Sequence, residues 1–115
     1  MIYSVVGNRT GWDYETIRAK LIAVGITTDD IIVSGGAEGV DSFANSFAKE
    51  IGCSMVTLYP NVLLPSPERY FERNTKIAEM CDVLIAFDKK KGRSGTKNTI
   101  NTARKLGREI LWVRC

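Results

Sequence analysis

The chain has 115 residues, of which 44% are hydrophobic and 25% are charged, and its formal net charge is +3. These values are typical of one globular domain, which we expect over residues 1–115. So small a net charge does not by itself indicate a nucleic-acid binder. No apolar run approaches the roughly 20 residues that cross a bilayer, so we expect no membrane segment. The absence of histidine excludes Ser-His-Asp and Cys-His catalysis.

The three cysteines, Cys53, Cys81 and Cys115, are widely spaced and do not match the spacing of metal ligands. We therefore expect no metal site and no disulfide framework, and the reduced cysteines favour the cytoplasm as the compartment. No other cofactor is expected. The apolar start of the chain is short and is interpreted as a first strand rather than a signal peptide.

Apolar runs of strand-like composition alternate with helical periodicities along the chain, which predicts a parallel α/β sheet. Strands are expected at residues 2–6, 31–34, 54–59, 82–87 and 109–113. Helices are expected at residues 14–24, 40–51, 68–80 and 96–106, the first of them capped by Asp13 and ended by Gly25. The elements form a Rossmann-like three-layer sandwich with five parallel strands, for which we predict the order 3-2-1-4-5. A ligand is then expected at the carboxyl ends of the strands, near the switch point between the first and fourth.

Three glycine-bearing loops are expected at that edge of the sheet: Gly7-Asn8-Arg9, residues 34–41 and residues 92–96. The second loop reads Ser34-Gly35-Gly36-Ala37-Glu38-Gly39-Val40-Asp41 and joins a β-branched run to an amphipathic helix. Glycines let a ligand approach the backbone, and the free N–H groups of a helix start favour an anion. The loops therefore predict a pocket for a nucleotide or another phosphorylated ligand, although βα turns also need glycines for structural reasons.

Several polar side chains add to this prediction. Arg73 is assigned to a phosphate or carboxylate of the ligand, because a guanidinium binds such groups through two parallel hydrogen bonds. Asn74 lies in the apolar stripe of its helix, so its amide must be hydrogen-bonded, and we expect it to tie the helix to a neighbouring loop. Asp41 either complements the dipole of its helix or accepts hydrogen bonds from a ribose diol. Ser94 and Thr96 are interpreted as an anion-binding nest, as N-capping residues, or as both. The candidate ligand-binding residues are Gly7, Asn8, Arg9, Ser34, Gly35, Gly36, Gly39, Asp41, Arg73, Asn74, Ser94, Gly95 and Thr96.

Neither a dinucleotide fingerprint after the first strand nor a Walker A motif occurs, so NTP hydrolysis with Mg²⁺ is not expected. Trp12 is assigned first to core packing, with stacking on a base or covering an oligomer interface as the alternatives. The basic run Lys89-Lys90-Lys91-Gly92-Arg93 is interpreted first as a solvated loop.

The loop from Ser34 to Asp41, followed by Ala44, resembles the S-G-G-A-x-G-[IV]-D motif of the SLOG superfamily. That superfamily includes the DprA DNA-processing proteins, the YspA/YpsA-like proteins and the Lonely Guy (LOG) nucleoside-monophosphate phosphoribohydrolases. The resemblance covers nearly the whole chain through Gly7-Asn8-Arg9, Arg73-Asn74, residues 81–87, Ser94-Gly95-Thr96, Ala103 and Gly107, and it is closest to the stand-alone YspA-like proteins. It implies a Rossmann-like fold that binds a nucleotide or a nucleotide-derived ligand. The contacts that it implies are Gly35, Gly36, Gly39, Arg73, Ser94, Gly95 and Thr96.

LOG enzymes carry P-G-G-x-G-T-x-x-E, whose glutamate assists N-glycosidic cleavage, and Thr99 occupies the corresponding position here. We therefore rank binding or sensing of a nucleotide-like ligand first. Hydrolysis of an N-glycosidic or phosphate bond, with Asp41 or Glu38 as the carboxylate, ranks second. Binding of single-stranded nucleic acid in the manner of DprA ranks third. In that hypothesis Arg9, Arg73 and the run 89–93 neutralise phosphates, and Trp12 or Tyr70 stacks on bases. By family analogy a homo-oligomer is expected, with Val62-Leu63-Leu64 and the exposed side of helix 68–80 as candidate surfaces.

Overall fold

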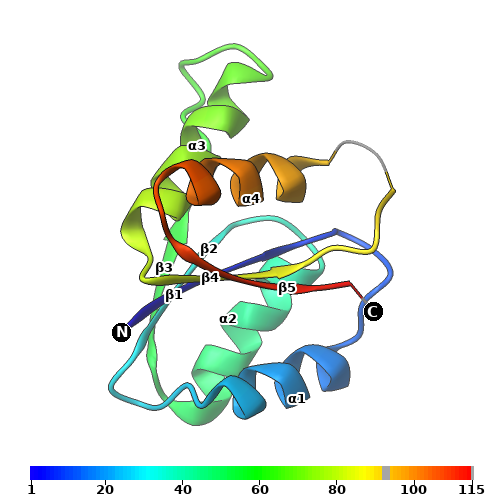
Figure 1. Ribbon diagram of the computed structural model, residues 1–115, viewed down its shortest axis with the longest axis vertical. Coiled ribbons are helices and arrows are strands. Elements are labelled where there is room, and N and C mark those ends of the chain that lie inside the picture. The colour runs from blue at the N-terminus through cyan, green and yellow to red at the C-terminus, as the bar shows by residue number, and fades with distance from the viewer. Residues whose placement is uncertain (92–93, 115) are drawn as a thin grey trace.

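Five parallel strands form one sheet in the order β3-β2-β1-β4-β5 (Figure 1). The computed structural model describes residues 1–91 and 94–114, so Gly92, Arg93 and Cys115 of the sequence interpretation lie outside the described residues. The strands are β1 (Ile2–Gly7), β2 (Ile31–Gly35), β3 (Ser54–Leu58), β4 (Val83–Phe87) and β5 (Glu109–Val113). The predicted sheet, including the direction and the order of its strands, is confirmed.

Four helices cover the two faces of the sheet and complete the predicted three-layer sandwich. The helices α1 (Tyr14–Val24) and α2 (Val40–Ile51) pack on one face, whereas α3 (Glu68–Met80) and α4 (Gly95–Lys105) pack on the other (Figure 1). Because all strands are parallel, the loops that lead into the helices gather at one edge of the sheet. No helix within residues 1–91 and 94–114 has the length and apolar character needed to cross a membrane.

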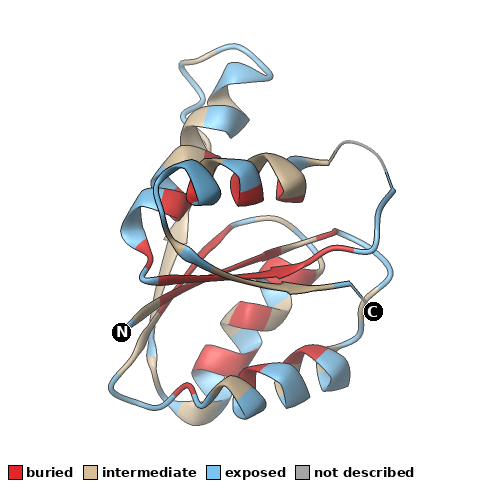
Figure 2. Cartoon of the chain, in the orientation of Figure 1, coloured by how far each residue is buried: buried red, intermediate tan, exposed pale blue. Residues whose placement is uncertain are grey.

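The hydrophobic core lies on both faces of the central strands, where the buried residues concentrate (Figure 2). Every residue of β4 is buried. Val83, Ile85 and Phe87 belong to the cluster beneath α1 and α2, and Leu84 and Ala86 belong to the cluster beneath α3 and α4. A strand buried on both faces needs no polar alternation, which explains why residues 83–87 form an uninterrupted apolar run.

Helix α1 begins and ends at the residues that the sequence predicts. The carboxylate of Asp13 accepts a hydrogen bond from the N–H of Thr16 at 2.7 Å. Gly25 follows the helix with a φ of 92°, a left-handed conformation that glycine adopts without strain.

Several predicted strand and helix ends are wrong by one residue. Asp82 lies just before β4, and its carboxylate accepts a hydrogen bond from the N–H of Ile2 at 2.7 Å. Tyr59 lies beyond β3 and is exposed. Ser94 caps α4 by accepting a hydrogen bond from the N–H of Lys97, so the helix begins one residue earlier than predicted. At the ligand edge, β1 and β2 each extend one residue further, to Gly7 and Gly35.

Candidate functional site

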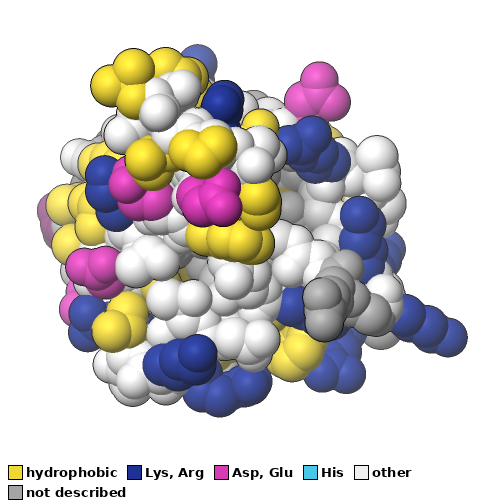
Figure 3. Space-filling model, turned by 90° about the horizontal axis from the view of Figure 1, so that it is seen from above, with side chains coloured by type: hydrophobic (Ala, Val, Ile, Leu, Met, Phe, Trp, Pro, Cys, Tyr) yellow, Lys and Arg dark blue, Asp and Glu magenta, His cyan; other side chains and the backbone are white. Residues whose placement is uncertain are grey.

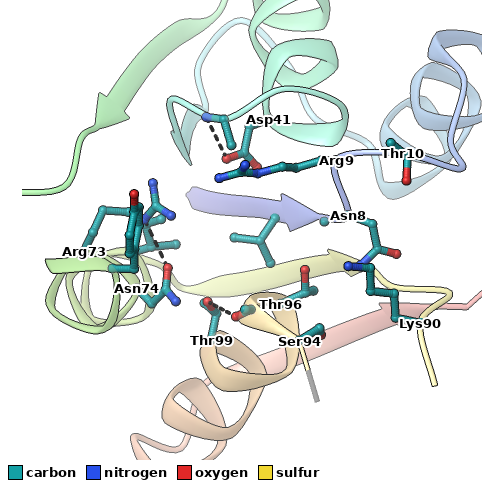
Figure 4. A pocket seen from close by; sticks show the side chains of 16 residues that line it. Asn8, Arg9, Thr10, Asp41, Arg73, Asn74, Lys90, Ser94, Thr96 and Thr99 are labelled. Carbon is teal, nitrogen blue, oxygen red and sulfur yellow. Dashed lines mark hydrogen bonds between the residues drawn. The ribbon is translucent and has the colours of Figure 1, made fainter. Parts of the chain in front are cut away.

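A cleft of about 290 Å³ opens at the carboxyl ends of β1 and β4, at the switch point of the sheet (Figure 4). We call it the main cleft. The loops after β1, β2 and β4 line it together with α3 and the first turn of α4. Its lining residues are Val6, Gly7, Asn8, Arg9, Thr10, Ala37, Asp41, Tyr70, Arg73, Asn74, Ile77, Lys90, Ser94, Gly95, Thr96 and Thr99. The position of the cleft follows from the strand order, because the loops after β1 and β4 diverge to opposite faces of the sheet.

Of the candidate ligand-binding residues, the main cleft brings together members of all three glycine loops and of α3. They are Gly7, Asn8, Arg9, Asp41, Arg73, Asn74, Ser94, Gly95 and Thr96. The remaining candidates, Ser34, Gly35, Gly36 and Gly39, do not line this cleft.

The main cleft has a positive character. Arg9 and Lys90 are exposed on its rim, and Arg73 is half-buried in its wall. The first turn of α4 adds the partial positive charge of a helix N-terminus. Asp41 is the one acidic residue among the described residues that line the cleft. Such an arrangement attracts an anion.

A chain of hydrogen bonds holds the Arg73 guanidinium in place. Its Nε donates to Oδ1 of Asn74 at 3.1 Å (Figure 4), and Nδ2 of Asn74 donates to Oδ1 of Asn98 at 3.1 Å. Asn74 is buried on α3 and Asn98 lies on α4, so the chain links the two helices across the cleft wall. The predicted hydrogen-bonded role of Asn74 is confirmed, although its partner is a helix residue rather than a loop.

The Asp41 carboxylate lies opposite this guanidinium. Asp41 is only 7% exposed, and burial raises its pKa to about 6. The N–H of Ala37, which donates to Oδ2 at 3.4 Å, and the charges of Arg73 and Arg9 act in the opposite direction. In Figure 4 the Arg9 side chain points toward Asp41. Burial likewise lowers the pKa of Arg73, and the charge of Asp41 partly offsets that effect. The two groups are therefore partly desolvated charges of opposite sign, and both lie over Gly35.

Asn8 lies on the cleft wall, but its amide is occupied by contacts within the protein. Nδ2 donates to Oδ1 of Asp88 at 2.8 Å, and Oδ1 accepts from the N–H of Lys89 at 2.8 Å and from Nε1 of Trp12 at 3.3 Å. The Asn8 carbonyl also accepts from the N–H of Val40. Asn8 thus fastens the loop after β1 to the loop after β4 and to the start of α2, and it shapes the cleft.

Asp88 is a buried carboxylate that the sequence interpretation did not single out. Besides Asn8, it faces Nζ of Lys97 at 3.2 Å and accepts from the N–H of Lys90 at 3.2 Å. Burial by itself would raise its pKa, but the hydrogen bonds from Asn8, Lys97 and Lys90 outweigh that effect and hold it below the usual range. Lys97 also donates to the carbonyl of Lys90. This group holds Lys90 at the rim of the cleft. An acidic residue directly after a buried strand at the switch point is the sequence signal that could have revealed it.

Several residues of the second glycine loop, 34–41, do not face the main cleft. Ser34 is buried and its hydroxyl donates to the carbonyl of Val5 at 2.6 Å. Gly39 has a φ of 75° and packs directly on the backbone of Arg9, so no side chain fits there. Glu38 is exposed and lines neither pocket.

Gly35 and Gly36 line a second, smaller hollow of about 120 Å³, which we call the Tyr59 pocket. Its lining residues are Gly35, Gly36, Ala37, Asp41, Ser42, Asn45, Thr57 and Tyr59. Ala37 and Asp41 line both hollows.

Seven cleft residues were not among the candidate ligand-binding residues: Val6, Thr10, Ala37, Tyr70, Ile77, Lys90 and Thr99. Of these, Tyr70 and Lys90 entered only the DprA-like alternative. Tyr70 lies three residues before Arg73 on α3, so helical spacing could have placed both on one face. Trp12 packs edge-on against Phe87 with ring centroids 5.3 Å apart, beneath Nζ of Lys89. Packing is therefore the structural role of Trp12.

Within residues 1–91 and 94–114, no group of three or more Cys, Asp or Glu residues is placed to hold an ion. The chain has no histidine.

No protein-family model and no curated protein sequence matches this chain. Among solved structures, DNA processing protein A (DprA) from Streptococcus pneumoniae is similar at 21% identity and a TM-score of 0.79, over 96% of this chain and 49% of that chain. The structural-genomics target TM1055 is similar at 19% identity and a TM-score of 0.68, over 96% of this chain and 72% of that chain.

Identities this low establish the fold alone, and the chain spans about half the length of the DprA chain that it matches. The expected Rossmann-like fold and its likeness to DprA are thereby confirmed. The chain shares the Rossmann-like fold of DNA processing protein A.

Proposed function

We propose that the main cleft binds a nucleotide or a nucleotide-derived phosphorylated ligand. The observation that carries this proposal is the convergence of Arg9, Arg73 and Lys90 with the first turn of α4 at the switch point of the sheet. Three cations from three different segments, around a cleft whose lining has one carboxylate, match an anionic ligand of limited size.

The first turn of α4 supplies the phosphate position. The N–H groups of Lys97 and Asn98 donate to the side chain and the carbonyl of Ser94. Among the described residues, the N–H groups of Gly95 and Thr96 have no such partner. These two donors and the helix dipole favour an anion at this position.

Hydrolysis of an N-glycosidic or phosphate bond is the second candidate function. Asp41 favours it, because a buried carboxylate with a pKa of about 6 beside an anion site has the properties of a general acid or base. Thr99 stands where LOG enzymes carry a glutamate, and its hydroxyl donates to the carbonyl of Gly95 at 3.2 Å. Glu38 lies outside the cleft. We therefore place ligand binding ahead of hydrolysis.

DprA-like binding of single-stranded nucleic acid is the third candidate. The fold shared with DprA and the exposed Lys89, Lys90 and Lys91 beside the cleft support it. Trp12, which could have stacked on a base, is instead packed on Phe87. Tyr70 remains as an exposed aromatic side chain at the cleft.

The experiment that tests the proposed function is a thermal-shift panel of mononucleotides, cyclic nucleotides, NAD, ADP-ribose and short single-stranded oligonucleotides. A ligand at 100 times its Kd stabilises the protein by about 2.7 kcal/mol, which raises the Tm by several degrees. Arg73→Ala should abolish the shift. Arg104→Ala, which removes an exposed arginine of α4 outside the cleft, should retain it.

The outcomes of the thermal-shift panel distinguish the three candidate functions. A shift with small nucleotides supports the proposal, and release of base or phosphate on longer incubation would add hydrolysis. Shifts with oligonucleotides alone, fading as salt rises, would replace the proposal with the DprA-like function. No shift with any member of the panel would contradict all three.

We further propose that the protein forms a homo-oligomer through the apolar surface at the start of α3. Val62, Leu63 and Phe71 are 75%, 89% and 48% exposed. Apolar side chains gather on the face of the molecule seen in Figure 3, where Lys and Arg side chains crowd its right and lower edges. An exposed apolar group of this kind fits the same surface of a second copy. A monomeric mass in light scattering would contradict this proposal.

A further inference from the structure

The Tyr59 pocket adjoins the main cleft. Asp41 and Ala37 line both hollows, so the two hollows adjoin at these residues. The Asp41 carboxylate stands on the boundary. A ligand group that lies at this boundary can donate a hydrogen bond to the Asp41 carboxylate.

The two hollows differ in charge. Arg9, Arg73 and Lys90 line the main cleft, whereas the described lining of the Tyr59 pocket contains no lysine or arginine and has the Asp41 carboxylate as its one charged side chain. A phosphate in the Tyr59 pocket would face like charge at close range, while a hydroxyl group would donate to that carboxylate. Nη1 of Arg73 also lies over Gly35, at the boundary between the two hollows. An anionic group is therefore favoured on the side of the main cleft, where the three cations converge, and a neutral donor is favoured in the Tyr59 pocket.

Other groups of the Tyr59 pocket are suited to a hydroxylated ring. Asn45 and Thr57 are half-buried, and within the described part of the chain their side chains make no hydrogen bond to protein groups. Tyr59 is 72% exposed, and its ring lies against Gly36 so closely that no Cβ fits there. An amide, a hydroxyl and the face of an aromatic ring around one carboxylate are the groups that bind a sugar.

We propose that the Tyr59 pocket is a sugar subsite, an inference that rests on the proposed function. In it Asp41 accepts hydrogen bonds from the ribose hydroxyl groups of the ligand, and Thr57 and Asn45 complete the polar contacts. The ring of Tyr59 covers the sugar from the solvent side. The phosphate of the same ligand lies in the main cleft, at the first turn of α4.

The test compares AMP with 2′-deoxy-AMP and 3′-deoxy-AMP by isothermal titration calorimetry on the whole chain. A hydrogen bond from a hydroxyl to a carboxylate contributes enough for at least one deoxy probe to bind about 10-fold more weakly than AMP. Thr57→Val removes a hydroxyl group and keeps nearly the same volume. It should weaken AMP binding and bring the Kd values of AMP and the deoxy probes closer together. Thr102→Val is the control, because Thr102 is also half-buried and lies outside both hollows. Its hydroxyl donates to the backbone carbonyl of Asn98, so this change should leave the AMP-to-deoxy ratio of Kd as in the wild type.

A variant of the anion site separates the two proposals. Lys90→Ala should weaken AMP and both deoxy probes by the same factor and leave the ratio unchanged. If AMP and both deoxy probes bind wild-type protein equally, the sugar subsite is overturned and the proposed function stands. If Thr57→Val behaves like Thr102→Val, the subsite is likewise overturned. If none of the three probes binds, the subsite is overturned together with nucleotide monophosphate binding at the main cleft.

Discussion

The guanidinium of Arg73 and the carboxylate of Asp41 both lie directly over Gly35, where the sheet edge carries no side chain. A Cβ atom at Gly35 would lie 2.6 Å from Nη1 of Arg73 and 2.8 Å from Oδ2 of Asp41. The glycine therefore provides the space in which the two charged groups approach each other. This gives the second glycine loop a role that differs from direct contact with a phosphate.

Gly35→Ala is expected to displace both charged groups. Because the backbone of Gly35 lies outside the left-handed region, the effect comes from the new contacts rather than from backbone strain. Overpacking of this kind costs about 1–3 kcal/mol, and we expect the affinity for a nucleotide to fall as well. Gly95→Ala is the control for stability, because a Cβ there would meet nothing within 4 Å. Equal melting temperatures for the two variants would contradict this account of Gly35.

Asn98 is expected to position Arg73 through Asn74, without touching the ligand. Asn98→Ala removes the acceptor for Nδ2 of Asn74, so the guanidinium loses its fixed orientation. We expect the Kd for a nucleotide to rise by roughly 3- to 10-fold, the equivalent of one neutral hydrogen bond. Asn98→Asp keeps an acceptor oxygen and should restore binding. Asn101→Ala, on the exposed side of α4, should have no effect. A failure of Asn98→Asp to rescue Asn98→Ala would argue against a positioning role.

Asp41→Asn is expected to stabilise the protein at neutral pH. Because the pKa of Asp41 rises from 3.8 to about 6 on folding, the folded state holds the proton more tightly than the unfolded state. This contribution to stability is fully present below pH 4 and is lost as the pH rises through 6. The Asp41→Asn side chain does not titrate in this pH range. The free energy of unfolding of the variant, relative to that of the wild type, should therefore increase between pH 4 and 7 by roughly 3 kcal/mol. Denaturant unfolding across this pH range measures it, and a constant difference between the two proteins would contradict the prediction.

The contributions of Asp88 and Lys97 to the stability of the protein are expected to be strongly coupled. The Asp88 side chain is fully buried, so Lys97→Met leaves a buried carboxylate without its cation and should cost about 3 kcal/mol or more at pH 7. Asp88→Asn combined with Lys97→Met should cost less than the sum of the single changes. Because the pKa of Asp88 is held below its usual range, the stability from this group is present above pH 4 and is lost on acidification. Additive single changes in urea unfolding would show that the pair is not coupled.

Much of the fold could be predicted from the sequence, because it follows from local patterns. The apolar run of β4 and the helical spacing in α2 specify their elements directly. Parallel connectivity then leaves few strand orders, and the switch point follows from the order. For the same reason Gly7, Ser94 and Gly95, which the sequence predicts in loops at one edge of the sheet, line one cleft there.

The contacts made by individual polar groups were decided only by the tertiary structure. The sequence placed Asn8 in a ligand loop, but its amide is occupied by Asp88, a residue 80 positions away. The partner of Asn74 is Asn98 on the next helix, and spacing along α3 predicts a face but not a partner. Gly35 and Gly36 belong to the Tyr59 pocket because β3 ends beside β2, so that Thr57 and Tyr59 lie next to them. Local periodicity thus determined the elements and the edge of the sheet that carries the cleft. Long-range packing determined which polar groups remain free to meet a ligand, since each such group bonds to whatever the fold brings within about 3 Å of it.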